Sequence, residues 1–139
     1  RDFDAYQAQA PKPPPGGLVY QVLAYEDRVD LLLDASDVAV TRSGGTVFEL
    51  MAAGVPAILV PLPIATRDHQ MANAEAVAAT GGAIVVPDAE LDTDRLEQEL
   101  ATLLSDRARL ATMADALRAA ARVDAAEAVV AVVERVARG

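Results

Sequence analysis

Residues 37–60, DVAVTRSGGTVFELMAAGVPAILV, decide the fold, because two short apolar runs enclose a helical pattern. Asp37–Thr41 and Ala57–Val60 each hold an unbroken apolar run, as strands that are buried on both faces do. Thr46–Ala53 between them is expected to be a helix that ends at Gly54, a typical helix stop. Short apolar strands that alternate with helices predict parallel pairing, with helices covering both faces of the sheet.

The same alternation continues on both sides of this stretch. Residues 11–17 (PKPPPGG) are expected to be irregular, since proline lacks a donor N–H and constrains the residue before it. Further strands are expected at Leu18–Ala24 and Ala83–Val86. Further helices are expected at Arg1–Ala10, Asp27–Ala35, Asp68–Thr80, Asp94–Leu104, Asp106–Ala121 and Asp124–Arg138, the last with Val129, Val133 and Val136 facing inward. We therefore predict an α/β fold in which residues 1–139 form one Rossmann-like domain, a doubly wound and mostly parallel sheet of about four strands with a helical C-terminal tail.

The composition of the 139 residues excludes several classes of function. Without cysteine the chain has no disulfide scaffold, thiolate metal site or cysteine nucleophile, and its single histidine excludes sites that need two imidazoles. No apolar run approaches the roughly 18–20 residues of a membrane span. The net charge of −9 argues against a nucleic-acid-binding surface, which needs a basic face. We expect a soluble, cytoplasmic protein with no nucleic-acid partner.

The loop after the first of these strands, TRSGG, is a candidate anion site. Ligands of open parallel sheets bind at the carboxyl ends of the strands, where loops lead into helices. Glycines let backbone N–H groups approach an anion, and the N-terminus of the following helix favours phosphate. Thr46 and Glu49 also have the spacing of a capping box, so a capped helix after a tight turn explains the same residues. The loop is neither a Walker motif nor a dinucleotide fingerprint, but a nucleotide diphosphate stays possible.

A second candidate loop, Pro61–Ala74, follows the next strand. It enters a helix that carries His69, Gln70 and Asn73 within one turn, neutral groups suited to sugar hydroxyls. The alternative is a solvated first turn with Asp68 as its N-cap. Because both loops open onto the same edge of the sheet, together they favour a ligand site more than either does alone.

Taken together, these motifs resemble a known enzyme family. The likeness lies in TRSGGTVFELMAAGVPAILVPLP (residues 41–63), RDHQMANA (67–74), GGAIVV (81–86) and, upstream, RDF (1–3) and LAYEDRVDLLLDASDVAVTRSGG (23–45). These stretches are similar to the donor-binding half of MurG-type glycosyltransferases, and the similarity extends from Arg1 to about Ala121. This family transfers N-acetylglucosamine from UDP-GlcNAc to lipid I, an undecaprenyl-pyrophosphoryl muramyl-peptide, in peptidoglycan synthesis. The resemblance implies the donor half of a GT-B fold.

The resemblance also implies how the nucleotide is held. Backbone amides of the glycine-rich turn would bind the UDP diphosphate: Ser43, Gly44, Gly45 and Thr46. Glu49 in the following helix would bind the ribose hydroxyls. The helix N-terminus, with Arg42, would stabilise the charge that develops on the leaving UDP.

The sugar and the base are assigned in the same way. His69 and Gln70 would bind the sugar hydroxyls with support from Asn73, while Tyr25 and Glu26 would line the uracil pocket. No residue of this chain is assigned as catalytic base. No cofactor is predicted and no metal site is assigned, because no carboxylate pair is placed to hold a metal ion.

The sequence departs from the family pattern in two respects. SGGTVFEL (residues 43–50) is one residue shorter than the family's turn usually is, which moves the start of the helix relative to the diphosphate. The chain also lacks the family's N-terminal acceptor domain, which carries the general base and the membrane-facing patch, and the first two strands of the donor domain. We therefore expect an N-terminally incomplete UDP-sugar-binding domain that is inactive alone, from a family peripheral to the inner face of the cell membrane.

Three functions stay open on these grounds. The chain is the donor-binding part of an inverting transferase, with UDP-GlcNAc as ligand and the missing N-terminal domain as partner. Alternatively, it is a stand-alone UDP-sugar-binding subunit that works with a separate acceptor subunit, or a ligand-free dimerising α/β module. Because a sheet without its central strands exposes an edge, a homodimer or a swapped assembly is also expected.

Overall fold

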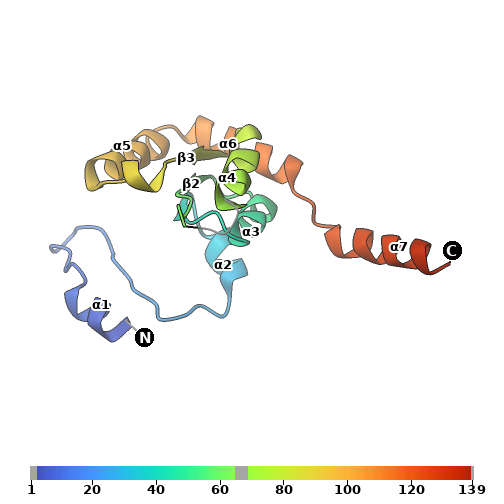
Figure 1. Ribbon diagram of the computed structural model, residues 1–139. Helices are drawn as coiled ribbons and strands as arrows, with labels where there is room; N and C mark the ends of the chain where they lie inside the picture. The colour runs from blue at the N-terminus through green and yellow to red at the C-terminus, as the bar shows by residue number, and fades with distance from the viewer. Residues whose placement is uncertain (1–2, 65–68, 139) are drawn as a thin grey trace.

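The computed structural model describes residues 3–64 and 69–138, and its centre is a parallel sheet of three short strands (Figure 1). β1 (Ala39–Thr41), β2 (Ala57–Leu59) and β3 (Ala83–Val85) lie in this order, so β2 is the central strand. The register aligns the last residues of the strands, which are Thr41, Leu59 and Val85. The carboxyl ends of all three strands therefore meet at one edge, where ligands of such sheets bind.

Helices cover both faces of the sheet, as predicted. One face packs against α2 (Val29–Asp34), α3 (Thr46–Ala53) and α4 (His69–Ala79). The other face packs against α5 (Thr93–Leu104) and α6 (Arg107–Ala120), and Leu117 of α6 also belongs to the first core. The remaining elements are α1 (Phe3–Gln9), the 3-10 turn η2 (Asp88–Glu90) and α7 (Ala125–Ala137). Except for η2, which was not predicted, these helices and the three strands were expected, and their described bounds lie within two residues of the predicted ones.

The central strand joins the two apolar cores. Ala57 and Leu59 pack with Val47 and Leu50 of α3 on one face, whereas Ile58 packs with the α5–α6 side on the other. All three residues of β2 are buried, which confirms the prediction of a strand covered on both faces. Because β2 is packed on both faces, its position between the two cores is fixed. The loops at the carboxyl edge of the sheet therefore begin at a fixed place.

The predicted strand at Leu18–Ala24 does not form, so the sheet has three strands and not about four. This segment has no regular structure, and Leu18 and Val19 are 88% and 92% exposed. An apolar run becomes a strand only where a neighbouring strand satisfies its backbone N–H and C=O groups. Within the part of the chain that the structure describes, β1–β3 are the strands present, and none of them pairs with this segment.

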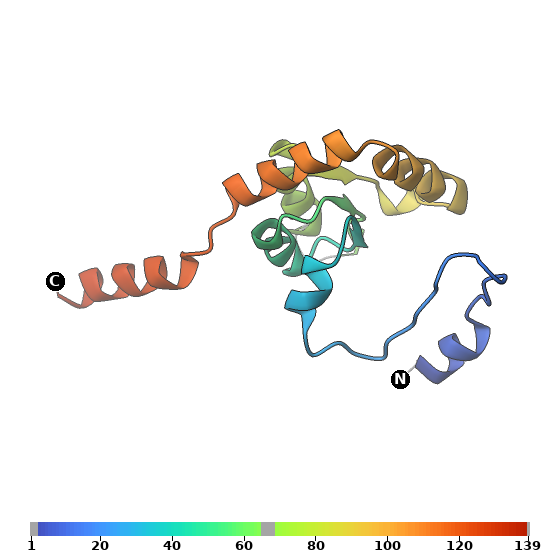
Figure 2. The same cartoon turned by 180° about the vertical axis from the view of Figure 1, so that it is seen from behind.

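The inward orientation predicted for the valines of the last helix is also wrong. Val129, Val133 and Val136 are all exposed, and α7 contributes no buried residue. After α6 the backbone becomes extended at Ala121, and α7 points away from the rest of the molecule (Figure 2). The periodic valines give α7 an apolar side, but no described part of the chain covers it. None of the helices within residues 3–64 and 69–138 is long and apolar enough to cross a membrane.

The capping box predicted at Thr46 and Glu49 is absent from the structure. α3 begins at Gly45 as N-cap, with helical φ and ψ of −60° and −28° and no side-chain cap. Thr46 is therefore already inside the helix, one position beyond the place where its hydroxyl could cap it. Two other helices do have side-chain caps, because Asp92 of α5 and Asp106 of α6 accept hydrogen bonds from the backbone three residues later.

Gly82→Ala tests how α6 packs on the sheet. A methyl group at the buried Gly82 would overlap Leu117, a fully buried residue of α6. We expect the free energy of unfolding, measured by urea denaturation, to fall by about 1–3 kcal/mol because the site is overpacked. Gly44→Ala is the control, since a Cβ there meets nothing within 4 Å, and its change should stay within about 0.5 kcal/mol. Equal stability of the two variants would contradict this packing.

Candidate functional site

Ser43 anchors the glycine-rich turn between β1 and α3. Its side chain is fully buried, and its hydroxyl donates a hydrogen bond to the backbone carbonyl of Gln70 at 2.7 Å. Its own carbonyl accepts a hydrogen bond from Asn73 Nδ2 at 3.1 Å. Both partners belong to the first turns of α4, so the two loops predicted to share one edge of the sheet are joined there.

Gln70 also fixes the second loop. Its Oε1 accepts a hydrogen bond from the backbone N–H of Leu62 at 2.9 Å, which ties the exit from β2 to α4. His69 begins α4 and is exposed. The recognition of sugar hydroxyls by His69, Gln70 and Asn73 stays a prediction, because Gln70 and Asn73 are seen here bonded to the protein backbone. Asp68, the expected N-cap of this helix, lies outside the described residues.

Gly44 and Gly45 leave open space in front of α3. Neither has a positive φ, so a left-handed backbone does not require glycine at either position. A Cβ added to either one would meet nothing within 4 Å. The N–H groups of Val47 and Phe48 already bond the carbonyls of Gly44 and Gly45, so the donors that the turn can present are the amides before them, with no side chain in front of the two glycines. An anion can approach α3 closely here, and the exposed Thr46 follows as the first helical residue.

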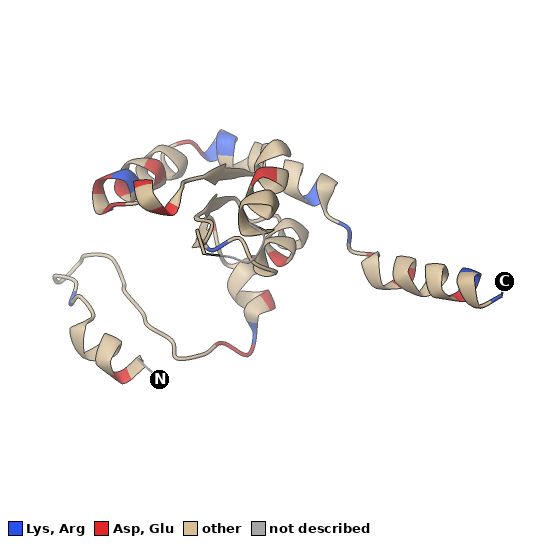
Figure 3. Ribbon diagram, viewed as in Figure 1, with Lys and Arg blue, Asp and Glu red and all other residues tan. Residues whose placement is uncertain are grey.

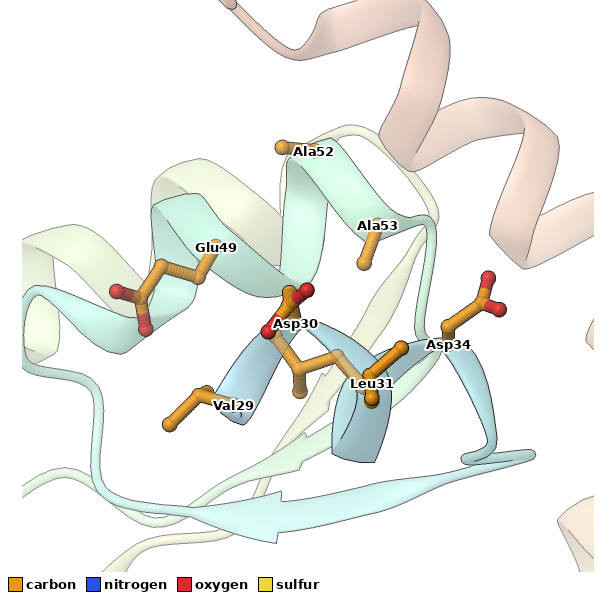
Figure 4. Close-up of a pocket in the computed structure, with 8 residues that line it drawn as sticks. Val29, Asp30, Leu31, Asp34, Glu49, Ala52 and Ala53 are labelled. Atoms are coloured by element: carbon orange, nitrogen blue, oxygen red, sulfur yellow. The ribbon is translucent and has the colours of Figure 1, made fainter. Parts of the chain in front are cut away.

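Glu49 lies one helical turn after Gly45, on the same side of α3. It lines a groove of about 580 Å³ between α2 and α3, and the ribbon in Figure 3 is red at acidic positions of both helices. The other lining residues are Val29, Asp30, Leu31, Leu33, Asp34, Ala52 and Ala53 (Figure 4). The groove therefore combines apolar walls with carboxylates, which accept hydrogen bonds from hydroxyl groups.

Arg28 keeps one of these carboxylates ionised. Its Nε and Nη2 donate to the two carboxylate oxygens of Asp30, at 3.0 and 2.8 Å. These hydrogen bonds lower the pKa of Asp30 below its ordinary value and raise the pKa of Arg28. Asp30 is therefore ionised near neutral pH, and its charge is paired with the Arg28 guanidinium at the start of α2.

Arg42 has two partners within the protein. Its guanidinium forms an ion pair with Asp88 of η2, and Nη1 also donates to the carbonyl of Val60 at 3.2 Å. The predicted role of Arg42 beside the leaving UDP stays a prediction, because the structure shows its charge shared with a carboxylate. Any anion that binds Arg42 has to compete with Asp88.

Tyr25 and Glu26 are not brought to the glycine-rich turn. Tyr25 is 80% exposed, and Glu26 Oε1 accepts a hydrogen bond from the backbone N–H of Arg28 at 2.8 Å. Among the described residues, no hydrogen bond given by the structure links either of them to Gly44 or Gly45. Their role in the uracil pocket stays a prediction. It requires that a partner or a ligand brings this segment to the site.

Two acidic residues of the site were missed by the sequence reasoning. Asp88 follows β3 closely, and the rule that pointed to the loops after β1 and β2 applies equally to this third strand. Asp30 lines the same groove as Glu49 but belongs to α2, and no local sequence signal predicts that these two helices share a groove. Within residues 3–64 and 69–138 no cluster of three or more potential metal ligands occurs.

Ser43→Ala tests the anchor of the turn. The substitution removes the donor to the Gln70 carbonyl in a fully buried place, so we expect the free energy of unfolding to fall by about 1–3 kcal/mol. Thr46→Ala is the matched control three residues away, where the absent cap predicts a change within about 0.5 kcal/mol. Urea denaturation measures both. A larger loss for Thr46→Ala than for Ser43→Ala would contradict the anchor and restore the capping box.

Comparison with known proteins identifies relatives of this chain. Residues 3–129 match the glycosyltransferase family 28 C-terminal domain. A UDP-N-acetylglucosamine–N-acetylmuramyl-(pentapeptide) pyrophosphoryl-undecaprenol N-acetylglucosamine transferase of Methylococcus capsulatus is 45% identical over 119 residues, which are 80% of this chain and 34% of that protein. The transferase of the same name from Mycobacterium sp. strain JLS is 41% identical over 131 residues, 94% of this chain and 35% of that protein. The chain thus spans about a third of the length of the curated relatives it matches.

Solved structures agree with this result. The crystal structure of MurG from Acinetobacter baumannii superimposes with a TM-score of 0.85 and 34% identity, over 97% of this chain and 39% of that one. The glycotransferase of kitacinnamycin gives a TM-score of 0.56, also with 34% identity, over 71% of this chain and 25% of that one. The predicted GT-B half is therefore confirmed as the fold.

Proposed function

Because the chain belongs to the glycosyltransferase family 28 C-terminal domain, we propose that it is the donor-binding part of a GT-B transferase that uses UDP-GlcNAc. The acceptor that fits this proposal is an undecaprenyl-pyrophosphoryl muramyl-peptide, since the relatives are named for it. The product serves peptidoglycan synthesis. The observation that carries the proposal is the open, anchored glycine-rich turn in front of α3.

The proposed pose of the donor follows the chemistry of the surfaces. The diphosphate lies at the backbone amides of the turn, formed by Ser43, Gly44, Gly45 and Thr46, where the positive end of the α3 dipole favours it. The ribose hydroxyls donate to Glu49, one helical turn further along. In this pose the phosphate oxygens accept hydrogen bonds from backbone N–H groups, and the ribose hydroxyls donate hydrogen bonds to a carboxylate.

The rest of the donor extends to both sides of the turn. We assign the sugar hydroxyls to the first turns of α4, through His69, Gln70 and Asn73. Gln70 and Asn73 use one side-chain atom each for the backbone bonds described above, so the other amide atom of each has to serve the sugar. The uracil is assigned to Tyr25 and Glu26, whose segment would have to order on it.

Sugar transfer also needs groups that this proposal does not place in the chain. With inversion, the acceptor hydroxyl attacks the anomeric carbon, the bond from that carbon to UDP breaks, and the electron pair passes to the β-phosphate oxygen. The hydroxyl proton goes to a general base. The amides before α3 stabilise the leaving UDP. We assign the base to the polypeptide that completes the enzyme, and the chain alone is expected to bind the donor without transferring sugar.

Calorimetric titration with UDP-GlcNAc tests the donor site. Glu49→Ala should weaken binding by about 10- to 100-fold, since a hydrogen bond to a charged group contributes about 1.5–3 kcal/mol. Gly45→Ala should weaken binding as well, because its methyl group enters the space for the diphosphate. Glu97→Ala, which removes an exposed carboxylate of α5 on the other face, is the matched control.

The same titration distinguishes the alternatives. If the chain itself binds UDP-GlcNAc, it is either a stand-alone UDP-sugar-binding subunit or a part of a transferase. A separate acceptor subunit that works together with the chain would favour the stand-alone subunit. If the chain gives no heat but a protein extended to the length of the relatives binds, the donor domain is incomplete. No binding by either protein would contradict the proposal and favour a ligand-free module, and an unchanged affinity of Glu49→Ala would contradict the assigned ribose contact.

The partner of this chain is proposed from its uncovered apolar surfaces. Five valines of α7 are 49–74% exposed: Val129, Val130, Val132, Val133 and Val136. β1 is an edge strand, and its Val40 is 43% exposed. We assign these surfaces to the polypeptide that completes the transferase, which also makes the contact with the inner face of the membrane where the lipid-linked acceptor lies. Without that polypeptide, a second copy of the chain covers them.

Self-association of the chain can be measured by sedimentation equilibrium. We expect a dimer or a swapped assembly, and Val133→Asp should shift it toward the monomer because a charge cannot be buried there without a partner. Arg135→Ala, on the opposite side of α7, is the control and should leave the mass unchanged. A monomeric mass together with a cooperative melt of the unchanged chain would contradict self-association.

A further inference from the structure

The register of the sheet predicts a backbone hydrogen bond to the Val60 carbonyl, and in the structure a side chain makes this bond instead. The β1–β2 ladder runs from Ala39 N–H, which donates to Pro56, to Val60 N–H, which donates to the Thr41 carbonyl. Because N–H and C=O of one residue point to the same side in a parallel strand, the Val60 carbonyl also faces β1. A longer β1 would satisfy it through the N–H of Ser43.

The chain leaves the sheet at Ser43, and the Arg42 side chain takes over this bond. Its Nη1 donates to the Val60 carbonyl at 3.2 Å. The same nitrogen pairs with Asp88, which follows β3 in η2. One guanidinium thus connects the carboxyl ends of all three strands at the point where β1 turns into the glycine-rich loop.

We propose that Arg42 and Asp88 form a positioning pair that fixes the glycine-rich turn and is not itself a phosphate ligand. With its Val60 bond made by a side chain, the backbone at Ser43 is released to turn away toward α4, where Ser43 is buried and bonded. Asp88 holds the guanidinium in the orientation that reaches Val60. The effect of this pair on the affinity for UDP-GlcNAc rests on the donor site proposed above, but its effect on the conformation of the turn does not.

Asp88→Asn separates the two roles of Arg42. If Arg42 were a phosphate ligand, loss of its competing carboxylate would leave the affinity for UDP-GlcNAc unchanged or raise it. In a positioning pair, Asp88→Asn and Arg42→Gln weaken binding alike, by about 3- to 10-fold, the worth of one or two hydrogen bonds in water-exposed surroundings. The double variant should be no weaker than either single one, and Arg42→Lys, which keeps a cation, should recover part of the affinity.

Amide hydrogen exchange tests the pair without any ligand. We expect Arg42→Gln and Asp88→Asn to speed exchange at residues 43–46 by about 3- to 10-fold, since local opening becomes easier. Arg107→Gln is the matched control, because Arg107 pairs with Asp37 at 2.6 Å beside the amino end of β1, at the opposite side of the sheet. Unfolding midpoints in urea should be the same for Asp88→Asn and this control, as expected for a half-exposed pair.

Two results would overturn the proposal. One is exchange at residues 43–46 that is no faster in the Arg42 and Asp88 variants than in the control. The other is an affinity that falls in Arg42→Gln but not in Asp88→Asn, which makes Arg42 a phosphate ligand. If the unchanged chain does not bind UDP-GlcNAc, the affinities are measured in the protein extended to the length of the relatives. If that protein does not bind either, the proposed donor site fails, and hydrogen exchange by itself tests the pair.

Discussion

The buried position of Ser43 is the constraint on which the candidate site depends. Its hydroxyl and carbonyl are both removed from water, and both are satisfied by α4. An unpaired polar group in that place would cost about 1–3 kcal/mol, so the end of β1 and the start of α4 are held together. The direction in which α3 begins follows from this junction, and with it the direction of the backbone N–H groups that face the open space at Gly44 and Gly45.

Strands of three residues are short for holding the loops of a site in place, and the two apolar cores supply the stability that the strands lack. β2 is buried on both faces, and its neighbours keep it in register, so the carboxyl edge stays level although each strand contributes little ladder of its own. Side chains extend the ladder where the backbone stops, as Arg42 does at Val60 and Gln70 does at Leu62. Rigid placement of the site therefore comes from packing below the edge and from side-chain to backbone hydrogen bonds at it.

Local patterns were enough to predict most of the fold and part of the site. Apolar runs and helix stops such as Gly54 are read within a few residues, and so β1–β3 and α3–α6 were predicted close to their observed bounds. The segment 18–24 failed because strand formation depends on a neighbour in space. The valines of α7 show the same limit, since periodicity identifies an apolar side but not what covers it. At the site, the edge rule joined Ser43 with Gln70 and Asn73, whereas Asp88 pairs with Arg42 from a distant part of the sequence, a contact that spacing does not encode.

An acidic chain with a net charge of −9 can still bind a diphosphate if the donors are backbone groups. Among the described residues, the guanidinium groups of Arg42 and Arg28 already have carboxylate partners, Asp88 and Asp30. The amides before α3 have no such competitors, and the helix dipole adds its attraction only within the first turn. The carboxylates of the groove would repel a phosphate placed beside them, which confines the anion to the turn and leaves the groove for hydroxyl-bearing parts of the ligand. In the proposed pose, the separation of charges along α3 would set the direction in which the nucleotide lies.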